Sequence, residues 1–160
     1  MCPPRLRKGG GKVALRITNA ADYAIRSMLY IASLPEDRVV LRSEVAEAQK
    51  IPSSFMAKIL RGLVRAGLLR SSRGVHGGFA LAKPASDITL LEVIEAIEGP
   101  ISVTNCVPEP DACGHSANCP ASAVWARVQD QIAEILGDAS LETLVSTPRR
   151  NGRVIYQLGA

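Results

Sequence analysis

Residues 53–81 read SSFMAKILRGLVRAGLLRSSRGVHGGFAL, and this stretch decides the fold. Apolar residues recur in its first half at the spacing of one helix face, so we expect a helix that buries that face. Gly67 follows the last turn and predicts the end of this helix. In the second half, two short apolar runs, 68–70 and 79–81, flank the glycine-rich turn 71–78, which is the pattern of a β-hairpin. The apolar face of the expected helix consists of Phe55, Met56, Ile59, Leu60, Leu63 and Val64.

Two further helices are expected before this stretch. The first spans about Ala20 to Ser33, with Asn19 as its N-cap and Pro35 beyond its end. The second is brief and is joined to the basic helix by the tight connection 50–53. Two short helices joined by a tight turn, the second with basic residues on its free face, are a helix-turn-helix signature. The brief helix is indicated by Ser43 and Glu44 in its first turn and by Val45, Ala46 and Ala48 on one side.

Beyond the hairpin, the pattern predicts two more helices separated by a loop. An amphipathic helix at 90–97 follows capping residues 87–89 and stops at Gly99 and Pro100. The segment 101–120 is expected to be a loop, and a helix from Ser122 to Leu136 follows it. The apolar stripe of this last helix needs a partner to cover it, and symmetric pairing with a second copy is the simplest supplier. The stripe consists of Val124, Trp125, Val128, Ile132 and Ile135.

The fold class expected from these elements is mainly α with a small β-hairpin wing, namely a winged helix-turn-helix plus a long C-terminal dimerisation helix. At 160 residues the chain can bury a core without disulfides, and 47% hydrophobic but only 4% aromatic residues favour packed helices. The expected organisation is a disordered basic tail (1–14), the winged helix-turn-helix domain (15–100), a cysteine-bearing cluster-binding loop (101–121), the dimerisation helix with a short following segment (122–146) and a C-terminal tail (147–160).

The basic residues point to a polyanion. The formal charge is only +4, but between Lys58 and Arg73 there are five Lys or Arg and no acid. A helix fits the DNA major groove, and an Arg on a thin hairpin can enter a narrow minor groove. An ordinary solvated face and a plain surface hairpin are the alternatives, and the order of the three elements favours DNA. The candidate DNA-binding residues are Ser53, Ser54, Lys58, Arg61 and Arg65 on the helix and Arg73 and His76 in the wing.

Three of the four cysteines fall close together, at Cys106, Cys113 and Cys119. No apolar run approaches the roughly 18 residues of a membrane span and no secretory signal is present, so we expect a cytoplasmic protein, where structural disulfides are rare. Zinc sites generally use Cys-x2-Cys pairs, whereas iron–sulfur clusters accept wider spacings. The spacing favours an iron–sulfur cluster and leaves redox-active thiols and zinc as alternatives, with His115 as a possible further ligand.

Several motifs resemble the Rrf-two (Rrf2) family of winged-helix regulators, which includes IscR, NsrR and RirA. The resemblance covers Leu15 to about Val145, and the wing and the Glu-Gly ending are its most specific parts. It implies a homodimer that binds double-stranded promoter DNA under the control of an iron–sulfur cluster. The matching segments are 15–18, 22–24, 54–68, 73–81 and 88–99.

The resemblance also suggests the cluster ligands. Cys106, Cys113 and Cys119 match the three cluster cysteines of the family. IscR-like members place a His three residues after the last cysteine, where this chain has Ser122. Asp22 instead resembles the first-helix Asp that supplies the fourth ligand from the other subunit in NsrR-like proteins. The ligand set is therefore closer to NsrR and RirA and favours 4Fe-4S over 2Fe-2S.

The sequence thus predicts a cluster-dependent transcriptional regulator, a repressor that senses iron, redox state or nitric oxide. The alternative is a metal-free thiol-based redox regulator or a winged-helix interaction module. We expect no enzymatic activity, because no acid–base pair, nucleophile constellation or phosphate loop is present. We also expect the tail 1–14 to be dispensable for dimerisation and DNA binding.

Overall fold

A computed structural model describes residues 17–74, 77–104, 119–147, 149–150 and 153–154. The chain divides into two units. The winged-helix unit comprises Ile17–Ile101 with Ala133–Ala160, and the cysteine unit comprises Met1–Arg16 with Ser102–Ile132. Each unit is described by itself. The expected disordered tail 1–14 lies outside the described residues.

The first helix of the winged-helix unit, α1, spans Asn19–Ala32. Its N-cap is Thr18, whose hydroxyl accepts a hydrogen bond from the Ala21 N–H at 3.3 Å. The prediction of Asn19 as the cap was therefore wrong by one residue. The Thr18 N–H in turn donates to Glu98 Oε1 at 2.8 Å. Thr and Asn are both good N-cap residues, and this contact with the last residue of a helix far along the chain favours Thr18 over Asn19.

The helix-turn-helix consists of α2 (Arg42–Gln49) and α3 (Ser53–Arg65). Lys50 adopts a left-handed conformation (φ 53°) at the turn, which reverses the chain within three residues. At the other end of α3, Gly67 has φ 74°, and the N–H groups of Gly67 and Leu68 donate to the carbonyls of Val64 and Leu63. This is a Schellman cap, so the predicted role of Gly67 is confirmed.

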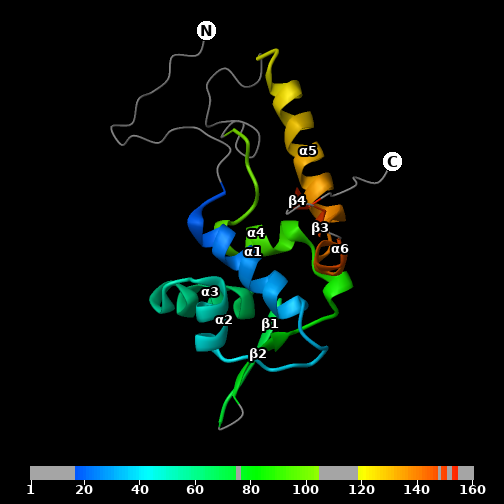
Figure 1. The fold of residues 1–160 in the computed structure, drawn as a ribbon. Coiled ribbons are helices and arrows are strands. Elements are labelled where there is room, and N and C mark those ends of the chain that lie inside the picture. Colours follow the sequence, from blue (N-terminus) through cyan, green and yellow to red (C-terminus); the bar gives the residue numbers. More distant parts are fainter. Residues whose placement is uncertain (1–16, 75–76, 105–118, 148, 151–152, 155–160) are drawn as a thin grey trace. The chain divides into compact units, whose positions relative to one another are not determined.

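The wing is an antiparallel hairpin of β1 (Leu69–Ser72) and β2 (Gly78–Leu81) that projects from the helices (Figure 1). Leu69 is paired with Leu81 and Ser72 with Gly78. Val40, just before α2, bridges Phe79 through two backbone hydrogen bonds of 2.8 and 2.9 Å. The base of the wing is therefore fixed directly to the helix-turn-helix.

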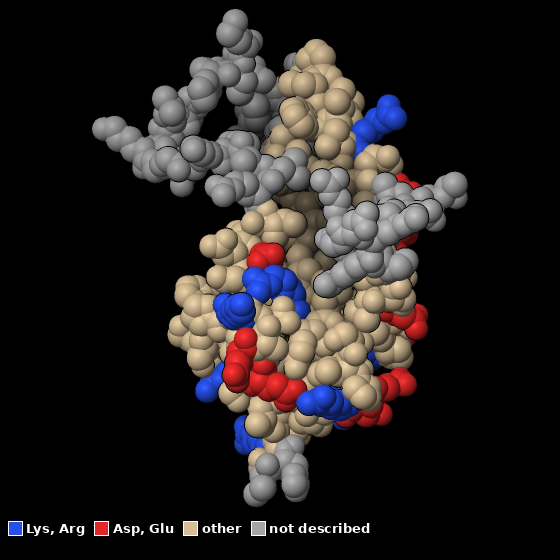
Figure 2. Space-filling view, in the orientation of Figure 1, with Lys and Arg blue, Asp and Glu red and all other residues tan. Residues whose placement is uncertain are grey.

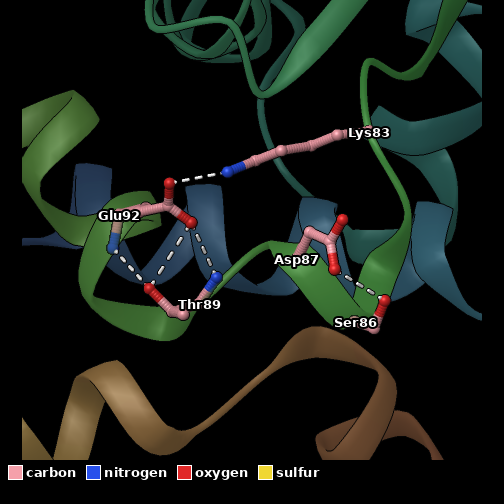
Figure 3. A network of polar contacts seen from close by, with 5 residues as sticks. All are labelled: Lys83, Ser86, Asp87, Thr89 and Glu92. Atoms are coloured by element: carbon pink, nitrogen blue, oxygen red, sulfur yellow. Dashed lines mark hydrogen bonds and ion pairs between the residues drawn. The ribbon is translucent and has the colours of Figure 1, made fainter.

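A short 3-10 helix, η1 (Ala85–Asp87), leads into α4 (Leu90–Glu98). Thr89 and Glu92 form a capping box, in which each side chain accepts a hydrogen bond from the backbone N–H of the other residue, at 3.2 and 2.9 Å (Figure 3). Lys83 Nζ lies 2.7 Å from the second oxygen of the same Glu92 carboxylate. One carboxylate thus fixes both the start of α4 and the chain that leaves the wing.

The chain returns to the winged-helix unit at Ala133, within its last long helix, and pairs with the start of α4 just beyond that helix. Leu90 donates to the carbonyl of Ala139, and Leu141 donates to that of Ile88, at 2.8 and 2.9 Å. The helix α6 (Leu141–Ser146) follows and packs against α1 and η1, with Leu141 fully buried. The sequence pattern had indicated only a short segment here. Residues 139–141 therefore belong to the same core as α1 and α4.

The core consists of side chains from α1, α2, α3, α4, α6 and the wing, as expected for a winged helix-turn-helix. Its largest fully buried members are Met28, Val40, Val45, Met56, Leu60, Leu63, Leu69, Ile88, Val93 and Leu141. Ser27 is a buried polar residue of this core, and its hydroxyl donates to the Tyr23 carbonyl at 2.7 Å.

The long helix α5 spans Ser122–Asp138, two residues longer than expected, and its part up to Ile132 belongs to the cysteine unit. None of its residues is buried. After α6, the two-residue strands β3 (Arg149–Arg150) and β4 (Arg153–Val154) pair antiparallel. Among the described residues, no helix has both the length and the apolar character needed to cross a membrane.

Candidate functional site

The exposed face of α3 carries the residues that the sequence marked as DNA-binding. Ser53, Ser54, Lys58, Arg61 and Arg65 are all exposed. The opposite face, with Met56, Ile59, Leu60 and Leu63, is buried in the core. Phe55 is the exception to the predicted apolar face, because its side chain is 54% exposed. The helix thus combines a firmly anchored face with a cationic one.

The cations of α3 differ from Arg26, Arg38, Arg70 and Lys83 of the winged-helix unit in having no acidic partner among the described residues. Within the described part of the chain, Lys58, Arg61 and Arg65 form no ion pair, whereas Arg38 binds Glu44, Arg70 binds Asp37 and Lys83 binds Glu92. On the side of the winged-helix unit drawn in Figure 2, acidic side chains are interspersed with basic ones, so that side is not one uniform basic field. Local unpaired cations, rather than net charge, therefore distinguish α3 as a surface for a polyanion.

Packing fixes the orientation of α3. Gly62 lies close against α4, because a Cβ added at this position would be only 3.1 Å from Ile97 Cδ1. On the other side, Arg26 of α1 donates to the Gln49 carbonyl at the end of α2. Tyr30 of α1 donates to Glu44 of α2 at 3.1 Å, and desolvation together with the Glu44 carboxylate raises the pKa of Tyr30, which keeps the phenol protonated. These contacts hold α2 and α3 in one position relative to α1 and α4.

In the wing, Arg73 is exposed and forms no ion pair with a described residue, while His76 lies outside the described residues. Two glycines allow the tight geometry at the base of the wing turn. Gly74 has φ 103°, and a Cβ on Gly78 would lie 2.5 Å from the carbonyl oxygen of Val40. The wing can therefore lie against the segment before α2 only because residue 78 has no side chain.

The sequence analysis missed two polar residues beside this surface. Arg42 and Ser43 begin α2 and, with Ser53 and the wing residues Gly78 and Phe79, line an open cavity of about 380 Å³. Arg42 is exposed and has no ion pair among the described residues. The signal was available, since a cation and a hydroxyl in the first turn of the predicted second helix lie close to the basic helix in any helix-turn-helix.

Of the three predicted cluster cysteines, only Cys119 lies within the described residues, while Cys106, Cys113 and His115 lie outside them. Cys119 is a free, partly exposed thiol three residues before the start of α5. Its carbonyl accepts hydrogen bonds from the Ser122 N–H at 3.0 Å and the Ser122 hydroxyl at 2.8 Å. Ser122 therefore closes this turn through both its backbone and its side chain.

The two described ends of the cysteine segment lie along α5. At one end, the Val103 N–H donates to Gln129 Oε1 at 3.4 Å. At the other end lies Cys119, one turn before α5. Ser122 and Gln129 are about 10 Å apart along the helix axis at 1.5 Å per residue. Among the described residues, no group of three His, Cys, Asp or Glu side chains forms a metal site.

Asp22 lies in the first turn of α1, within the winged-helix unit. Its side chain is 56% exposed and pairs with Arg26 at 3.5 Å, one helical turn away. A surface pair of this kind is weak. The carboxylate is thus accessible and loosely held, which suits either a helix-dipole partner or a ligand for a metal of another subunit.

Comparison with known proteins agrees with this geometry. The Rrf2 family, described as an iron-dependent transcriptional regulator, matches residues 17–147. CymR (YrzC), the global cysteine regulator of B. subtilis, has a similar structure, with a TM-score of 0.71, 26% identity, and coverage of 85% of this chain and all of that chain.

Two further solved structures are similar at lower identity and support the fold. CymR of Staphylococcus aureus has a TM-score of 0.65 at 24% identity, covering 83% of this chain and all of that one. IscR of T. potens has a TM-score of 0.65 at 24% identity, covering 84% of this chain and 89% of that one. The predicted winged-helix fold and family are both confirmed. With the match covering most of its length, the chain belongs to the Rrf2 family of DNA-binding transcriptional regulators, which are not enzymes.

Proposed function

We propose that this chain is a homodimeric transcriptional repressor that binds double-stranded promoter DNA through α3 and the wing, and that an iron–sulfur cluster controls this binding. The observation that carries the DNA-binding surface is the row of exposed cations on α3 that lack acidic partners among the described residues, next to a wing with an exposed Arg73. The signal would be iron supply, redox state or nitric oxide.

In this proposal α3 enters the major groove. Arg61 and Arg65 can donate two hydrogen bonds each to guanine edges, and Lys58 can bind a phosphate. Further hydrogen-bond donors would bind the DNA backbone on either side of the groove. They are the hydroxyl groups of Ser43, Ser53 and Ser54 and the guanidinium group of Arg42. Arg73 and His76 of the wing would contact the adjacent minor groove.

The homodimer is supported by α5. Val124, Trp125 and Ile135 are large apolar residues of this helix that remain exposed in the single chain. Exposed apolar faces of this size mark interaction surfaces, and a second copy offers an identical face for a two-fold symmetric pair. A two-fold dimer would present two α3 helices to two half-sites of an operator.

The donor set fits an iron–sulfur cluster. Thiolates are the usual ligands of such clusters, and Cys119, the described member of the three, is free of any disulfide and partly exposed. Cys106, Cys113 and Cys119 would hold the group, with Asp22 of the second subunit as a fourth ligand. When bound, a 4Fe-4S or 2Fe-2S cluster would supply iron that reacts with oxidants and nitric oxide.

The residues around Cys119 suggest how ligation is transmitted. Cys119 lies three residues before the start of α5, and its carbonyl is bound by Ser122 in the first turn of that helix. Holding the Cys119 thiolate therefore holds the start of the proposed dimerisation helix. A loop released from ligation would loosen this start and change the spacing of the two α3 helices. For this to act as a switch, the protein with a ligated cluster and the protein without one must differ in DNA affinity.

A metal-free thiol regulator is the second candidate. It is favoured by the free, partly exposed Cys119 thiol. In this case oxidation of the cysteines, without any metal, would change the loop before α5.

The DNA-binding surface can be tested with duplexes selected from a random library by the full-length protein. Arg61→Ala and Arg73→Ala should each weaken binding by about 1–3 kcal/mol, the value of a lost base contact, without unfolding the protein. Arg38→Ala is the matched control, because the Arg38 guanidinium is already neutralised by Glu44 at 2.8 Å. If Arg61→Ala and Arg73→Ala bound DNA as tightly as the wild type and Arg38→Ala at fixed salt, the DNA-binding surface would lie elsewhere.

The cluster can be tested by anaerobic purification, visible absorbance, and iron and sulfide analysis. Replacing any of Cys106, Cys113 or Cys119 with Ala should remove the cluster or make it far less stable, whereas Asp22→Ala should retain a more labile one, since a carboxylate is a weaker iron ligand than thiolate. Iron with sulfide would exclude the metal-free candidate. Stoichiometric zinc without iron or sulfide, or no metal at all, would refute the cluster.

The cross-subunit ligand has a separate test. Mixing Asp22→Ala with a variant lacking all three cysteines should give heterodimers with one complete site and one empty site. The wild-type cluster lifetime should return in half of the sites of these heterodimers. An unchanged cluster lifetime and spectrum in the Asp22→Ala homodimer would remove Asp22 from the ligand set without affecting the three cysteines.

A further inference from the structure

Phe55 is a large apolar side chain on a surface that is otherwise polar. It lies in the first turn of α3 and is 54% exposed. On the helix surface it neighbours Lys58, three residues later, and Lys58 neighbours Ser54. Phe55 therefore lies at the edge of the same face that exposes the cations, and helical periodicity alone had assigned it to the core.

We propose that Phe55 reads the 5-methyl group of a thymine in the major groove, and that it thereby contributes sequence specificity beyond the hydrogen bonds of Arg61 and Arg65. This inference rests on the proposed DNA-binding function of α3. Thymine alone presents a methyl group in the major groove, and Phe is one of the side chains that contact it. Residues near the N-terminus of a recognition helix are those that reach base edges.

The orientation of the Phe55 ring is fixed by its neighbours. Tyr23 of α1 packs edge-to-face against it, with ring centroids 6.3 Å apart and an interplanar angle of 76°. The Arg26 guanidinium lies 5.9 Å from the centroid of the same Tyr23 ring and also donates to the Gln49 carbonyl at the end of α2. Arg26, Tyr23 and Phe55 thus connect α1, α2 and α3, which limits the freedom of an exposed ring.

A ring held in this way suits readout of a methyl group. A flexible apolar side chain would lose rotamer freedom on contact with a base, whereas the Phe55 ring is already positioned by Tyr23. Burying one methyl group is equivalent to about a four-fold change in affinity. Phe55 should therefore discriminate modestly at one thymine of each half-site, alongside the stronger Arg contacts.

The test uses the full-length protein and a duplex that it selects from a random library. Each thymidine is replaced in turn by deoxyuridine, which pairs identically and lacks only the methyl group. The wild-type protein should lose about four-fold in affinity at one position per half-site. Phe55→Ala should bind more weakly and show no further loss with deoxyuridine at that position. Circular dichroism and thermal melting of the variant would verify that it folds.

Phe55→Leu provides a second variant if Phe55→Ala binds too weakly to measure. It keeps an apolar side chain but not the ring, and its loss on deoxyuridine substitution should be smaller than that of the wild type. The role of Phe55 would be overturned if every thymidine of the selected duplex could be replaced without loss of affinity. It would also be overturned if both variants lost as much affinity as the wild type on deoxyuridine substitution. Neither result would affect the proposed DNA-binding surface. Failure to select any duplex would overturn the DNA-binding surface and this inference together.

Discussion

The two units of the chain differ in how they satisfy their apolar side chains. Among the described residues of the winged-helix unit, twenty hydrophobic residues are buried, and they come from α1, α2, α3, α4, α6, the wing and the segments between them. In the described part of the cysteine unit no residue is buried, although α5 carries apolar residues at helical spacing. The first unit has an apolar core of its own, whereas the described part of the second leaves large apolar side chains exposed.

This difference separates two tasks of a regulator. The winged-helix unit must present α3 and the wing in a fixed geometry, because base contacts tolerate little displacement. In the function proposed above, the cysteine unit responds to a signal, and a segment without buried residues changes conformation at low cost in free energy. We therefore expect truncation of buried residues in the first unit to act on folding stability, and truncation of exposed apolar residues of α5 in the second to act on association.

The largest effect on folding should follow from Leu60→Ala. Leu60 of α3 is fully buried, so its truncation should lower the free energy of unfolding by about 2–5 kcal/mol. Leu41→Ala is the control, because Leu41 is 56% exposed and its truncation should change stability by less than about 0.5 kcal/mol. Urea unfolding at one protein concentration measures both. Equal losses would mean that the core of this unit is not as described.

Trp125→Ala tests the other side of the comparison. Trp125 of α5 is 41% exposed in the single chain, and an aromatic residue at the centre of an interface often contributes about 2 kcal/mol to association, or roughly 30-fold in the dissociation constant. We expect sedimentation equilibrium to show weakened dimerisation and little change in helix content. Arg127→Ala, an exposed polar position of the same helix, should dimerise normally. A wild-type protein that is monomeric at micromolar concentrations would refute the proposed interface.

Gly78→Ala should destabilise the wing. The new Cβ would lie 2.5 Å from the Val40 carbonyl oxygen and 3.0 Å from the carbonyl carbon, so the backbone bridge between Val40 and Phe79 must shift. A cost of about 1–3 kcal/mol is expected for such overpacking. Gly137→Ala in α5 is the matched control, since its Cβ would have only an ordinary contact, 3.9 Å from Leu91 Cδ2, and Ala favours helix. Destabilisation of both variants by the same amount would contradict a steric cause at Gly78.

Local patterns in the sequence predicted the helix-turn-helix, the wing and the start of α4 well. Each of these patterns involves only residues that are close together in the sequence. They are the apolar stripe of α3, Gly67 after its last turn, and Thr89 three residues before Glu92. Their physical basis is equally local, namely helical periodicity, a left-handed cap and a capping box. These features could be recognised without any knowledge of the tertiary contacts.

Features that depend on distant contacts could not be predicted in this way. Thr18 caps α1 with help from Glu98, which is 80 residues away, and Arg70 is neutralised by Asp37 from another segment. Sequence alone therefore could not separate the paired cations from the unpaired ones of α3. Phe55 was misassigned to the core because periodicity does not determine whether a residue at the edge of a stripe is covered.

Thr89→Ala tests a smaller, local contribution to the winged-helix unit. It removes the hydroxyl that accepts the Glu92 N–H at 3.2 Å, and loss of such a cap costs about 1 kcal/mol. Thr89→Ser keeps the hydroxyl and should retain most of the stability. Thermal unfolding of the three proteins compares them directly, and identical melting temperatures for wild type and Thr89→Ala would show that the capping box contributes nothing measurable.

The smallest expected effect is a pH dependence from Glu92. Burial alone would raise the pKa of this carboxyl, but the hydrogen bond from Lys83, those from the backbone and side chain of Thr89, and the Lys83 charge together lower it below 4.5. A carboxyl whose pKa is lower in the folded state stabilises the protein above its unfolded pKa, and this stabilisation is lost as the pH falls through the folded pKa.

Glu92→Gln isolates this contribution, because Gln can still form a capping box but carries no charge. The Glu92 and Lys83 side chains are 39% and 34% exposed, so solvent screens their attraction and the effect should be small. The wild type should be the more stable protein at about pH 6, and the difference from Glu92→Gln should shrink towards about pH 3. If the difference in stability between the wild type and Glu92→Gln stayed constant from about pH 6 to about pH 3, the carboxylate would act only as a hydrogen-bond acceptor in the cap.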